Sequence, residues 1–321
     1  MTMTDTILLT IDQQPVDTPA PFQLMVNMPL NEFKTIVNST LSNVRFAFDK
    51  NFNTPIYSWL ESMTDTNAVF WLNLPNGIKA GQQMTIYILF LPLSSEFDGV
   101  YAGCAPQLSA TYGEYDNGAL VFNFYDNFAG TALNTSKWNS AGTPSVDNGI
   151  TLAYPSYIGS VTTYTAPSNV LDFYANITAI NAGSVNADYG YIADTAQYTP
   201  SVVYAQNNGV PSSNNGSAFP WIVNSSQTFL PNGIVGQYIY SVYWSSSICK
   251  FWWDYTNEQF GTANIPTSAL PIGFYNNQGA GTTFIMTWVR IRAYPPNGVM
   301  PTVKIGKYLP LPITISAPQP I

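Results

Sequence analysis

Seven Asn-Gly pairs interrupt this sequence, and short runs of alternating apolar and polar residues lie between them. The pairs begin at Asn76, Asn117, Asn148, Asn208, Asn215, Asn232 and Asn297. Because Asn and Gly both tolerate a positive φ, this pair is the strongest short-range signal for a tight β-hairpin turn. Short strands joined by such turns predict an all-β protein of the sandwich or barrel type.

Strand-like alternation recurs along the chain, whereas helical periodicity is nearly absent. Apolar side chains alternate from Leu171 to Ala179, which is typical of one buried face of a sheet. Helical spacing occurs only around Leu30–Val37, so we expect less than about a tenth of the chain in helix. The predicted strands are Thr6–Ile11, Phe22–Asn27, Val44–Phe48, Ala68–Leu74, Gln83–Phe90, Ala119–Phe124, Leu171–Ile180, Gln237–Trp244, Ile248–Tyr255 and Phe284–Arg292.

The length of 321 residues exceeds that of one ordinary sandwich and suffices for two, each with its own core. A polar, Gly-containing stretch at 110–118 separates two strand-rich regions. We therefore predict two jelly-roll-like β-sandwich domains in tandem. They occupy residues 21–115 and 116–305, between an N-terminal arm at 1–20 and a Pro-rich C-terminal tail at 306–321.

Both predicted arms carry apolar residues that need burial. Thr6–Ile11 has strand character but is separated from Phe22 by three prolines, and Leu309, Leu311, Ile313 and Ile315 alternate in the tail. An unpaired apolar strand is prone to aggregate, so each arm either folds back on its own domain or pairs with a neighbour. We expect self-association or contact with other shell proteins through at least one arm, with fold-back as the open alternative.

Charged residues are scarce, at 9% of the chain against roughly 25% in an average soluble protein. The net charge is −8, and no Lys or Arg occurs between Lys137 and Lys250, so we expect no nucleic-acid partner. The longest apolar run, Ile86–Leu93, is far shorter than the roughly 20 residues that span a bilayer, so we expect no membrane insertion. No signal peptide is evident, so either an export signal was removed or the protein is made in the cytoplasm and reaches a surface by assembly; a native Met1 would favour the second.

The two cysteines, Cys104 and Cys249, lie far apart in the sequence. A disulfide between them would close a long loop and stabilise the fold by about 5 kcal/mol in the chain-entropy model. Two buried, reduced thiols are the alternative, and we favour it.

Histidine is absent from the sequence, which removes imidazole-based nucleophile systems and most zinc sites. Many sandwich glycosidases instead carry two carboxyl groups on a Glu-x-Asp-x-x-Glu strand. Glu114 and Asp116 begin this pattern, but Ala119 stands where the second Glu is required. We therefore predict that the chain is not an enzyme and has no catalytic residue, metal or cofactor.

The densest aromatic cluster, Phe251–Tyr255, contains the one candidate contact site. Strand alternation places Phe251, Trp253 and Tyr255 on one face, and Trp252 and Asp254 on the other. One face then fills the core, while the second offers a ring beside a carboxylate, which suits a sugar ring or a partner protein. The candidate ligand or partner contacts are Trp252, Trp253, Asp254 and Tyr255.

Several stretches resemble known surface-protein modules. The first third resembles a domain of unknown function from archaeal and bacterial surface proteins, through the stretches Val44–Asp49, Pro55–Glu61, Val69–Pro75 and Ala80–Ile88. The rest of the chain resembles a concanavalin A-like (laminin-G-like) jelly roll. Phe124–Gly130, Leu133 and Trp138 resemble its opening segment, and Trp288–Tyr294 resembles its closing strand. Such modules serve adhesion, sugar binding and structure alike, so the resemblance implies an architecture rather than one activity.

The chain also departs from these surface proteins, which are usually exported and anchored. A two-domain module that starts at Met1 resembles a virion appendage or capsid-associated protein, as in turreted archaeal viruses. The resemblance implies a structural or attachment protein on the virion surface, with host surface glycans among its partners. A cell-surface adhesin or carbohydrate-binding protein is the second interpretation, and a glycan-active enzyme is the third.

Overall fold

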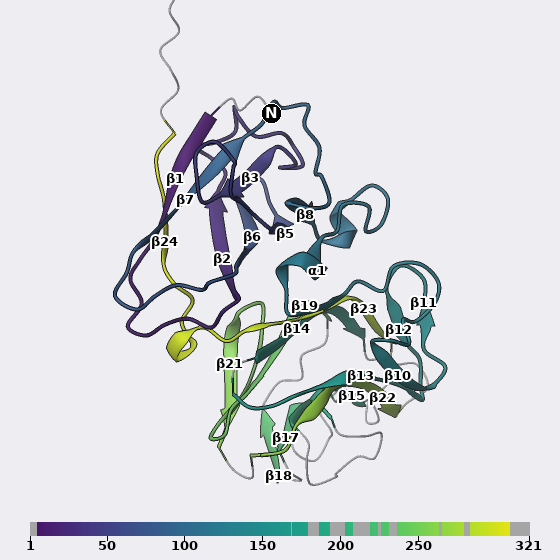
Figure 1. Cartoon of the computed structure of the whole chain (residues 1–321). Helices are drawn as coiled ribbons and strands as arrows, with labels where there is room; N and C mark the ends of the chain where they lie inside the picture. Colours follow the sequence, from purple (N-terminus) through teal and green to yellow (C-terminus); the bar gives the residue numbers. More distant parts are fainter. Residues whose placement is uncertain are drawn as a thin grey trace, which may run out of the picture.

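The computed structural model describes residues 5–167, 169–178, 186–192, 203–207, 219–223, 226–230, 236–262, 265–278 and 283–308. These residues form two β-sandwiches, one against the other, as Figure 1 shows. Helical structure in the described part is limited to α1 (Gly118–Val121) and two 3-10 turns, η1 (Pro106–Leu108) and η2 (Pro296–Gly298). The prediction of an all-β fold made of two sandwiches is confirmed.

The first sandwich consists of a five-stranded and a four-stranded sheet. The five-stranded sheet has the order β24 (Val303–Ile305), β1 (Asp5–Ile11), β7 (Met84–Phe90), β3 (Val44–Ala47) and β4 (Pro55–Ile56). The four-stranded sheet has the order β2 (Phe22–Pro29), β6 (Asn67–Leu74), β5 (Ser58–Met63) and β8 (Ala102–Cys104).

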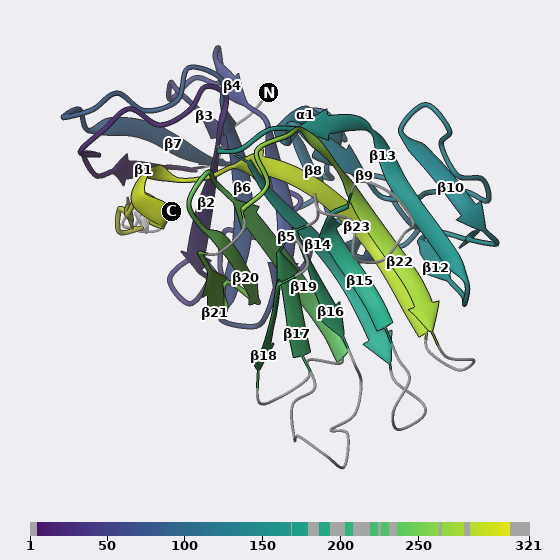
Figure 2. The ribbon, with the colours of Figure 1, turned by 90° about the horizontal axis from the view of Figure 1, so that it is seen from below.

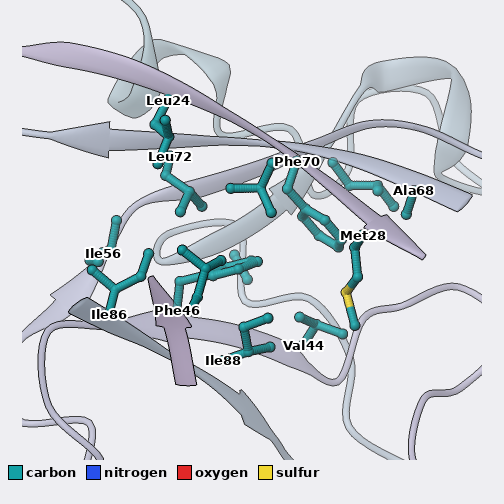
Figure 3. Packing of buried hydrophobic residues seen from close by; sticks show 14 of the residues in the cluster. Leu24, Met28, Val44, Phe46, Ile56, Ala68, Phe70, Leu72, Ile86 and Ile88 are labelled. Atoms are coloured by element: carbon teal, nitrogen blue, oxygen red, sulfur yellow. The ribbon is translucent and has the colours of Figure 1, made fainter. Parts of the chain in front are cut away.

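Alternating side chains from the two sheets fill the core of the first sandwich. Figure 3 shows Phe46, Ile86 and Ile88 of one sheet facing Phe70 and Leu72 of the other. All five are at most 1% exposed, and the rings of Phe46 and Phe70 meet edge to face at 5.3 Å. The period-2 pattern that predicted these strands is therefore the pattern that builds the core.

The second sandwich consists of a seven-stranded and an eight-stranded sheet. The seven-stranded sheet has the order β10 (Trp138–Gly142), β13 (Ser156–Tyr164), β22 (Leu270–Gln278), β15 (Asn186–Tyr191), β16 (Val203–Asn207), β17 (Phe219–Val223) and β18 (Ser226–Leu230). The eight-stranded sheet has the path β11 (Ser145–Val146), β12 (Ile150–Leu152), β23 (Thr283–Ala293), β14 (Asn169–Thr178), β19 (Gly236–Trp244), β20 (Cys249–Trp253) and β21 (Thr256–Gly261), with β9 (Phe124–Asp126) pairing with β23. Figure 2 shows the long strands of this sandwich side by side.

The segment that resembles a jelly-roll opening, which begins with β9 and reaches Trp138, has a structural role. The indole Nε1 of Trp138 donates to Asp126 Oδ2 at 2.7 Å, and the rings of Phe124 and Phe128 lie 5.4 Å and 5.7 Å from that indole. Trp138 is 1% exposed and belongs to the core of the second sandwich. The Asp and the aromatic residues of the signature thus anchor the start of the second sandwich on its core.

The boundaries of the predicted arms need a correction. Residues 5–11, expected in an N-terminal arm, form β1, which lies between β7 and β24. Residues 303–305, expected in the second domain, return to the first sandwich as β24, where Leu9 pairs with Ile305 (Figure 1). The pairing of β1 buries the apolar face of this segment, since Ile7, Leu9 and Ile11 are at most 4% exposed. The alternating residues of the tail, 309–315, lie outside the described residues.

One predicted strand, Ala119–Phe124, is wrong. The structure has helix α1 at Gly118–Val121 and begins β9 only at Phe124. Asn117 explains the difference, since its buried side-chain amide donates to the carbonyl oxygens of Ser58 and Val100 in the first sandwich. This anchor bends the chain where it passes from one sandwich to the other. Elsewhere, the segment 30–37, for which the sequence allowed two helical turns, forms hydrogen-bonded turns.

The Asn-Gly hairpin signal is confirmed at Asn148, because Asn148 and Gly149 have φ of 50° and 124° and connect the paired strands β11 and β12. Asn297 and Gly298 also have positive φ, of 55° and 76°, but they lie in η2, between two strands that do not pair with each other. Asn117 and Gly118 instead lead into α1. The pairs that begin at 208, 215 and 232 lie outside the described residues.

The two cysteines are separate, buried thiols, as favoured from the sequence. Cys104 lies in the first sandwich and Cys249 in the core of the second. Burial raises the pKa of Cys104 to about 11 and that of Cys249 to about 12. Both are therefore protonated at neutral pH and act as small apolar side chains.

Candidate functional site

An aromatic cluster lies where the two sandwiches meet. Trp59 and Trp71 come from β5 and β6, and Trp288 and Tyr125 come from β23 and β9. Phe122 comes from the segment that connects the sandwiches. The ring of Trp59 meets those of Trp288 and Phe122 edge to face, at 5.4 Å and 5.3 Å. The three tryptophans have no exposed surface. The contact is therefore packed like the interior of a single domain.

Arg290 of β23 is the centre of a buried ion network within this cluster. Its Nη2 lies 2.7 Å from Glu61 Oε2 of the first sandwich, and its Nε lies 3.0 Å from Asp172 Oδ2 of the second. Arg292 Nε lies 2.7 Å from the same Asp172 oxygen. Two guanidinium groups thus balance two carboxylates, and one of these pairs joins the two sandwiches.

Hydrogen bonds and rings complete the surroundings of Arg290. The Tyr255 hydroxyl donates to Glu61 Oε2 at 2.5 Å and accepts from Arg290 Nη2 at 2.6 Å. The guanidinium carbon of Arg290 lies 4.4 Å from the ring centroid of Trp71, a cation–π distance. Burial raises the pKa of Tyr255, so its hydroxyl keeps the proton that it donates.

The charges of the network persist despite burial. Burial alone would raise the pKa of Asp172, but Arg292, Arg290 and the Ser241 hydroxyl outweigh it and hold the pKa of that carboxyl below its usual range. Burial likewise disfavours the charged Arg290, yet Tyr255, Glu61 and Asp172 raise its pKa overall. The carboxylate of Asp172 and the guanidinium of Arg290 therefore remain ionised at neutral pH.

A cleft of about 210 Å³ opens beside this network, between the sandwiches. We call it the interdomain cleft. Its lining comprises Met25 and Trp71 of the first sandwich, Trp252, Tyr255, Glu258 and Arg292 of the second, and Tyr294, Pro295, Gly298 and Met300 of the segment that returns to the first. A neighbouring hollow of about 190 Å³, which also has Met25 and Met300 in its lining, lies between β2 and the returning segment.

The walls of the interdomain cleft are held in place. Tyr294 stacks on Tyr243 with ring centroids 3.5 Å apart and planes 10° apart. Gly298 has a φ of +76°, and a Cβ there would lie 2.4 Å from the Tyr294 hydroxyl oxygen, so this position requires glycine. Lys250 Nζ lies 2.9 Å from Glu258 Oε1 at the rim. Burial lowers the pKa of Lys250, but Glu258 and Tyr294 outweigh it and raise the pKa.

Two of the four predicted contact residues line the interdomain cleft. Trp252 and Tyr255 do so, whereas Trp253 packs against the core of the second sandwich. The carboxylate of Asp254 accepts the backbone N–H of Ile239 at 3.0 Å, within its own sheet. The functional role of these four residues remains a prediction.

The predicted strand, Ile248–Tyr255, ends two residues too late, because β20 ends at Trp253. Trp253 pairs with Thr256, so Asp254 and Tyr255 form a two-residue hairpin turn, with φ of 46° and 58°. This left-handed turn places Tyr255 on the same side as Trp252, toward the first sandwich, and not beside Phe251. Hairpin turns of this type favour Asn and Gly, so an Asp-Tyr pair gave no turn signal.

The sequence analysis missed the charged residues that position the cleft. Glu61, Arg290 and Arg292 each lie within an apolar strand, where a charged side chain is buried only if it is paired. Because charged residues are rare in this chain, a charged residue inside an apolar strand was the sequence feature that could have identified these three.

The two carboxylates considered for catalysis have different surroundings. Glu114 is exposed, whereas Asp116 accepts hydrogen bonds from Trp59 Nε1, the Tyr125 hydroxyl, Asn127 Nδ2 and the Gly118 amide, at 2.7–3.0 Å. Burial raises the pKa of Asp116 against these four bonds, which lower it. Asp116 therefore organises the connection between the sandwiches.

Two negative findings concern only the residues that the structure describes. Among them, no group of three or more His, Cys, Asp or Glu side chains is placed to hold a metal ion. The same part of the chain has no helix whose length and apolarity would let it cross a membrane.

No protein-family model matches the sequence. The chain is 31% identical over 332 residues to "Uncharacterized protein 562" of Sulfolobus islandicus rod-shaped virus 1, a match that covers 92% of this chain and 58% of the relative. It thus has a homologue in an archaeal virus. The match spans little more than half of that relative's length.

Solved glycoside hydrolases are also similar in structure. One is a Bacillus licheniformis beta-glucanase, at 18% identity and a TM-score of 0.41, covering 53% of this chain and 97% of the glucanase. Another is a glycosyl hydrolase family protein from Mycobacterium fortuitum, at 14% identity and a TM-score of 0.40, covering 53% of this chain and 99% of that protein.

These neighbours correct one prediction. The sequence analysis predicted that the chain is not an enzyme, and the recurrence of glucanases and other glycoside hydrolases among the similar structures contradicts that exclusion. The exclusion rested on the absence of histidine and on the incomplete Glu-x-Asp-x-x-Glu strand, but glycoside hydrolysis requires only two suitably placed carboxyl groups. At TM-scores of 0.41 and 0.40, the likeness brings neither a reaction nor a substrate to this chain.

Proposed function

We propose that this chain is a structural and attachment component of a virus particle, exposed at the particle surface. The observation that carries the proposal is the viral relative, whose match extends over 92% of this chain and therefore over both sandwiches. Its partners are further copies of itself or other proteins of the shell, and surface groups of the host.

The joint between the sandwiches supports a role as a rigid surface module. Interfaces between domains of one chain are usually modest in area and polar, so such domains generally move relative to each other. Here the buried pair of Glu61 and Arg290 and the ring cluster around it fix one sandwich on the other. The interdomain cleft then keeps its shape on a particle exposed to solvent.

Purified particles test the proposal directly. Particles of the encoding virus, banded by density and freed of cell debris, are expected to contain the chain by mass spectrometry. Fab fragments raised against the recombinant protein are expected to label intact particles in electron micrographs. The chain found only in infected-cell lysate, or on the membrane of uninfected cells, would contradict the proposal, and the second result would favour a cell-surface adhesin.

A further inference from the structure

We infer that the interdomain cleft binds an uncharged pyranose ring of a surface glycan, with Trp252 as the ring on which the sugar stacks. The inference deepens the proposed function, on which its biological setting rests. Its physical basis is the composition of the cleft, the balance of its charges and the rigidity of its walls.

The aromatic lining suits the apolar face of a sugar. Trp252 lies on the face of β20 that turns away from the core, since Cys249 and Phe251 occupy the core face. Trp252, Tyr255 and Tyr294 are half-buried, so part of each side chain remains open to the cleft. Half-exposed aromatic rings in a concave site provide flat apolar area with little loss of conformational entropy on binding.

The polar groups of the cleft suit hydroxyls better than ionised groups. Each charged side chain already has a counter-ion, because Glu258 pairs with Lys250 and Arg292 pairs with Asp172. An anionic sugar would have to compete with these partners, whereas a hydroxyl both donates and accepts. Glu258 offers an acceptor and Arg292 offers a guanidinium donor group without breaking either pair. The balance of charge therefore favours a neutral hexose.

The size of the cleft limits the ligand. Its volume of about 210 Å³ is below the roughly 300–1,000 Å³ of sites for drug-sized molecules, which fits one ring. The neighbouring hollow, which shares Met25 and Met300 with the cleft, has a similar volume of about 190 Å³, so a further sugar unit would lie on that side. A terminal or penultimate sugar of a glycan is thus the expected ligand.

The cleft is preformed. Tyr255 is fixed by Glu61 and Arg290, and Tyr294 is fixed by Tyr243. Binding of a ligand therefore orders few side chains, so the loss of conformational entropy on binding is small.

A glycan array carrying neutral glucose-, mannose- and galactose-terminated chains beside sialylated and sulfated ones tests the inference. The purified full-length protein is expected to bind at least one neutral class, and Trp252→Ala to weaken that binding about tenfold or more. Trp252→Phe, which keeps a ring, is expected to retain most of the affinity. Phe260→Ala is the matched control and is expected to bind like the wild type, since Phe260 is 60% exposed on the same hairpin but does not line the cleft.

The thermal unfolding temperature of each variant, measured beside the array, identifies losses that come from misfolding. Binding of sialylated or sulfated glycans alone would overturn the inference, as would neutral binding that a folded Trp252→Ala variant retains. If the protein binds no glycan while Fab fragments raised against it label intact particles, the inference is overturned and the proposed function stands.

Discussion

Replacement of Arg290 by alanine is expected to lower the free energy of unfolding by about 3–5 kcal/mol, the cost of removing one partner from a buried ion pair. The substitution leaves Glu61, which is 2% exposed, without its cation, and leaves Asp172 with one guanidinium instead of two. It also opens the space between the rings of Trp71, Phe122 and Trp288. Denaturant unfolding, followed by tryptophan fluorescence, measures the loss.

Two further variants separate charge burial from the loss of any ion pair. Lys79→Ala removes an exposed pair, in which Lys79 and Asp17 are 66% and 52% exposed, and is expected to cost about 1 kcal/mol or less. Arg290→Met combined with Glu61→Gln leaves Asp172 paired with Arg292, so it is expected to be less destabilising than the two single changes added together. Strict additivity, or an Arg290→Ala loss as small as that of Lys79→Ala, would contradict the account of the network.

The Asp116→Asn variant is expected to lose about 2–4 kcal/mol of stability, although it changes the side-chain volume little. One carboxylate oxygen accepts from Trp59 and Gly118, and the other accepts from Tyr125 and Asn127. An amide keeps one acceptor oxygen only. With that oxygen on Trp59 and Gly118, the Tyr125 hydroxyl can accept from the new NH₂ group, but the Asn127 amide cannot, so one N–H of each amide lacks an acceptor, at about 1–3 kcal/mol each. Thermal and denaturant unfolding of the variant measure the effect.

Glu114→Gln is the matched control, because Glu114 is exposed two residues earlier in the chain. It is expected to change stability by no more than about 0.5 kcal/mol. Equal stability of the two variants would contradict the structural role of Asp116. Should the protein hydrolyse a glycan, a loss of turnover in Asp116→Asn would identify a catalytic carboxylate only if the variant is still folded.

The fold was largely predictable because burial in a sandwich imposes period 2 on each strand. Leu9 and Ile11, Phe70 and Leu72, and Phe173 and Ala175 alternate in the sequence and are all buried in the structure. The pairing partners were less predictable. Nothing near residues 303–305 indicates that they pair with residues 9–11 at the other end of the chain, because such a contact depends on the whole fold.

The site was predictable only in part. Trp252 was identified because an aromatic residue on the outer face of a strand has no role in the core. Tyr255 was assigned to the wrong face, because a two-residue turn with an unusual composition reversed the alternation. Arg290 and Glu61 lie 229 positions apart, as their numbers give, and a pair so distant in the chain becomes visible only when both sandwiches are in place.

Adsorption competition tests most directly whether the chain attaches particles to their host through the interdomain cleft. Host cells are incubated with an excess of purified wild-type protein, Trp252→Ala or Phe260→Ala, and the fraction of added particles that adsorb is then counted. The wild type and Phe260→Ala are expected to block adsorption equally, and Trp252→Ala to leave it near the level without competitor. Equal blocking by all three proteins, or adsorption unaffected by the wild type, would contradict the account.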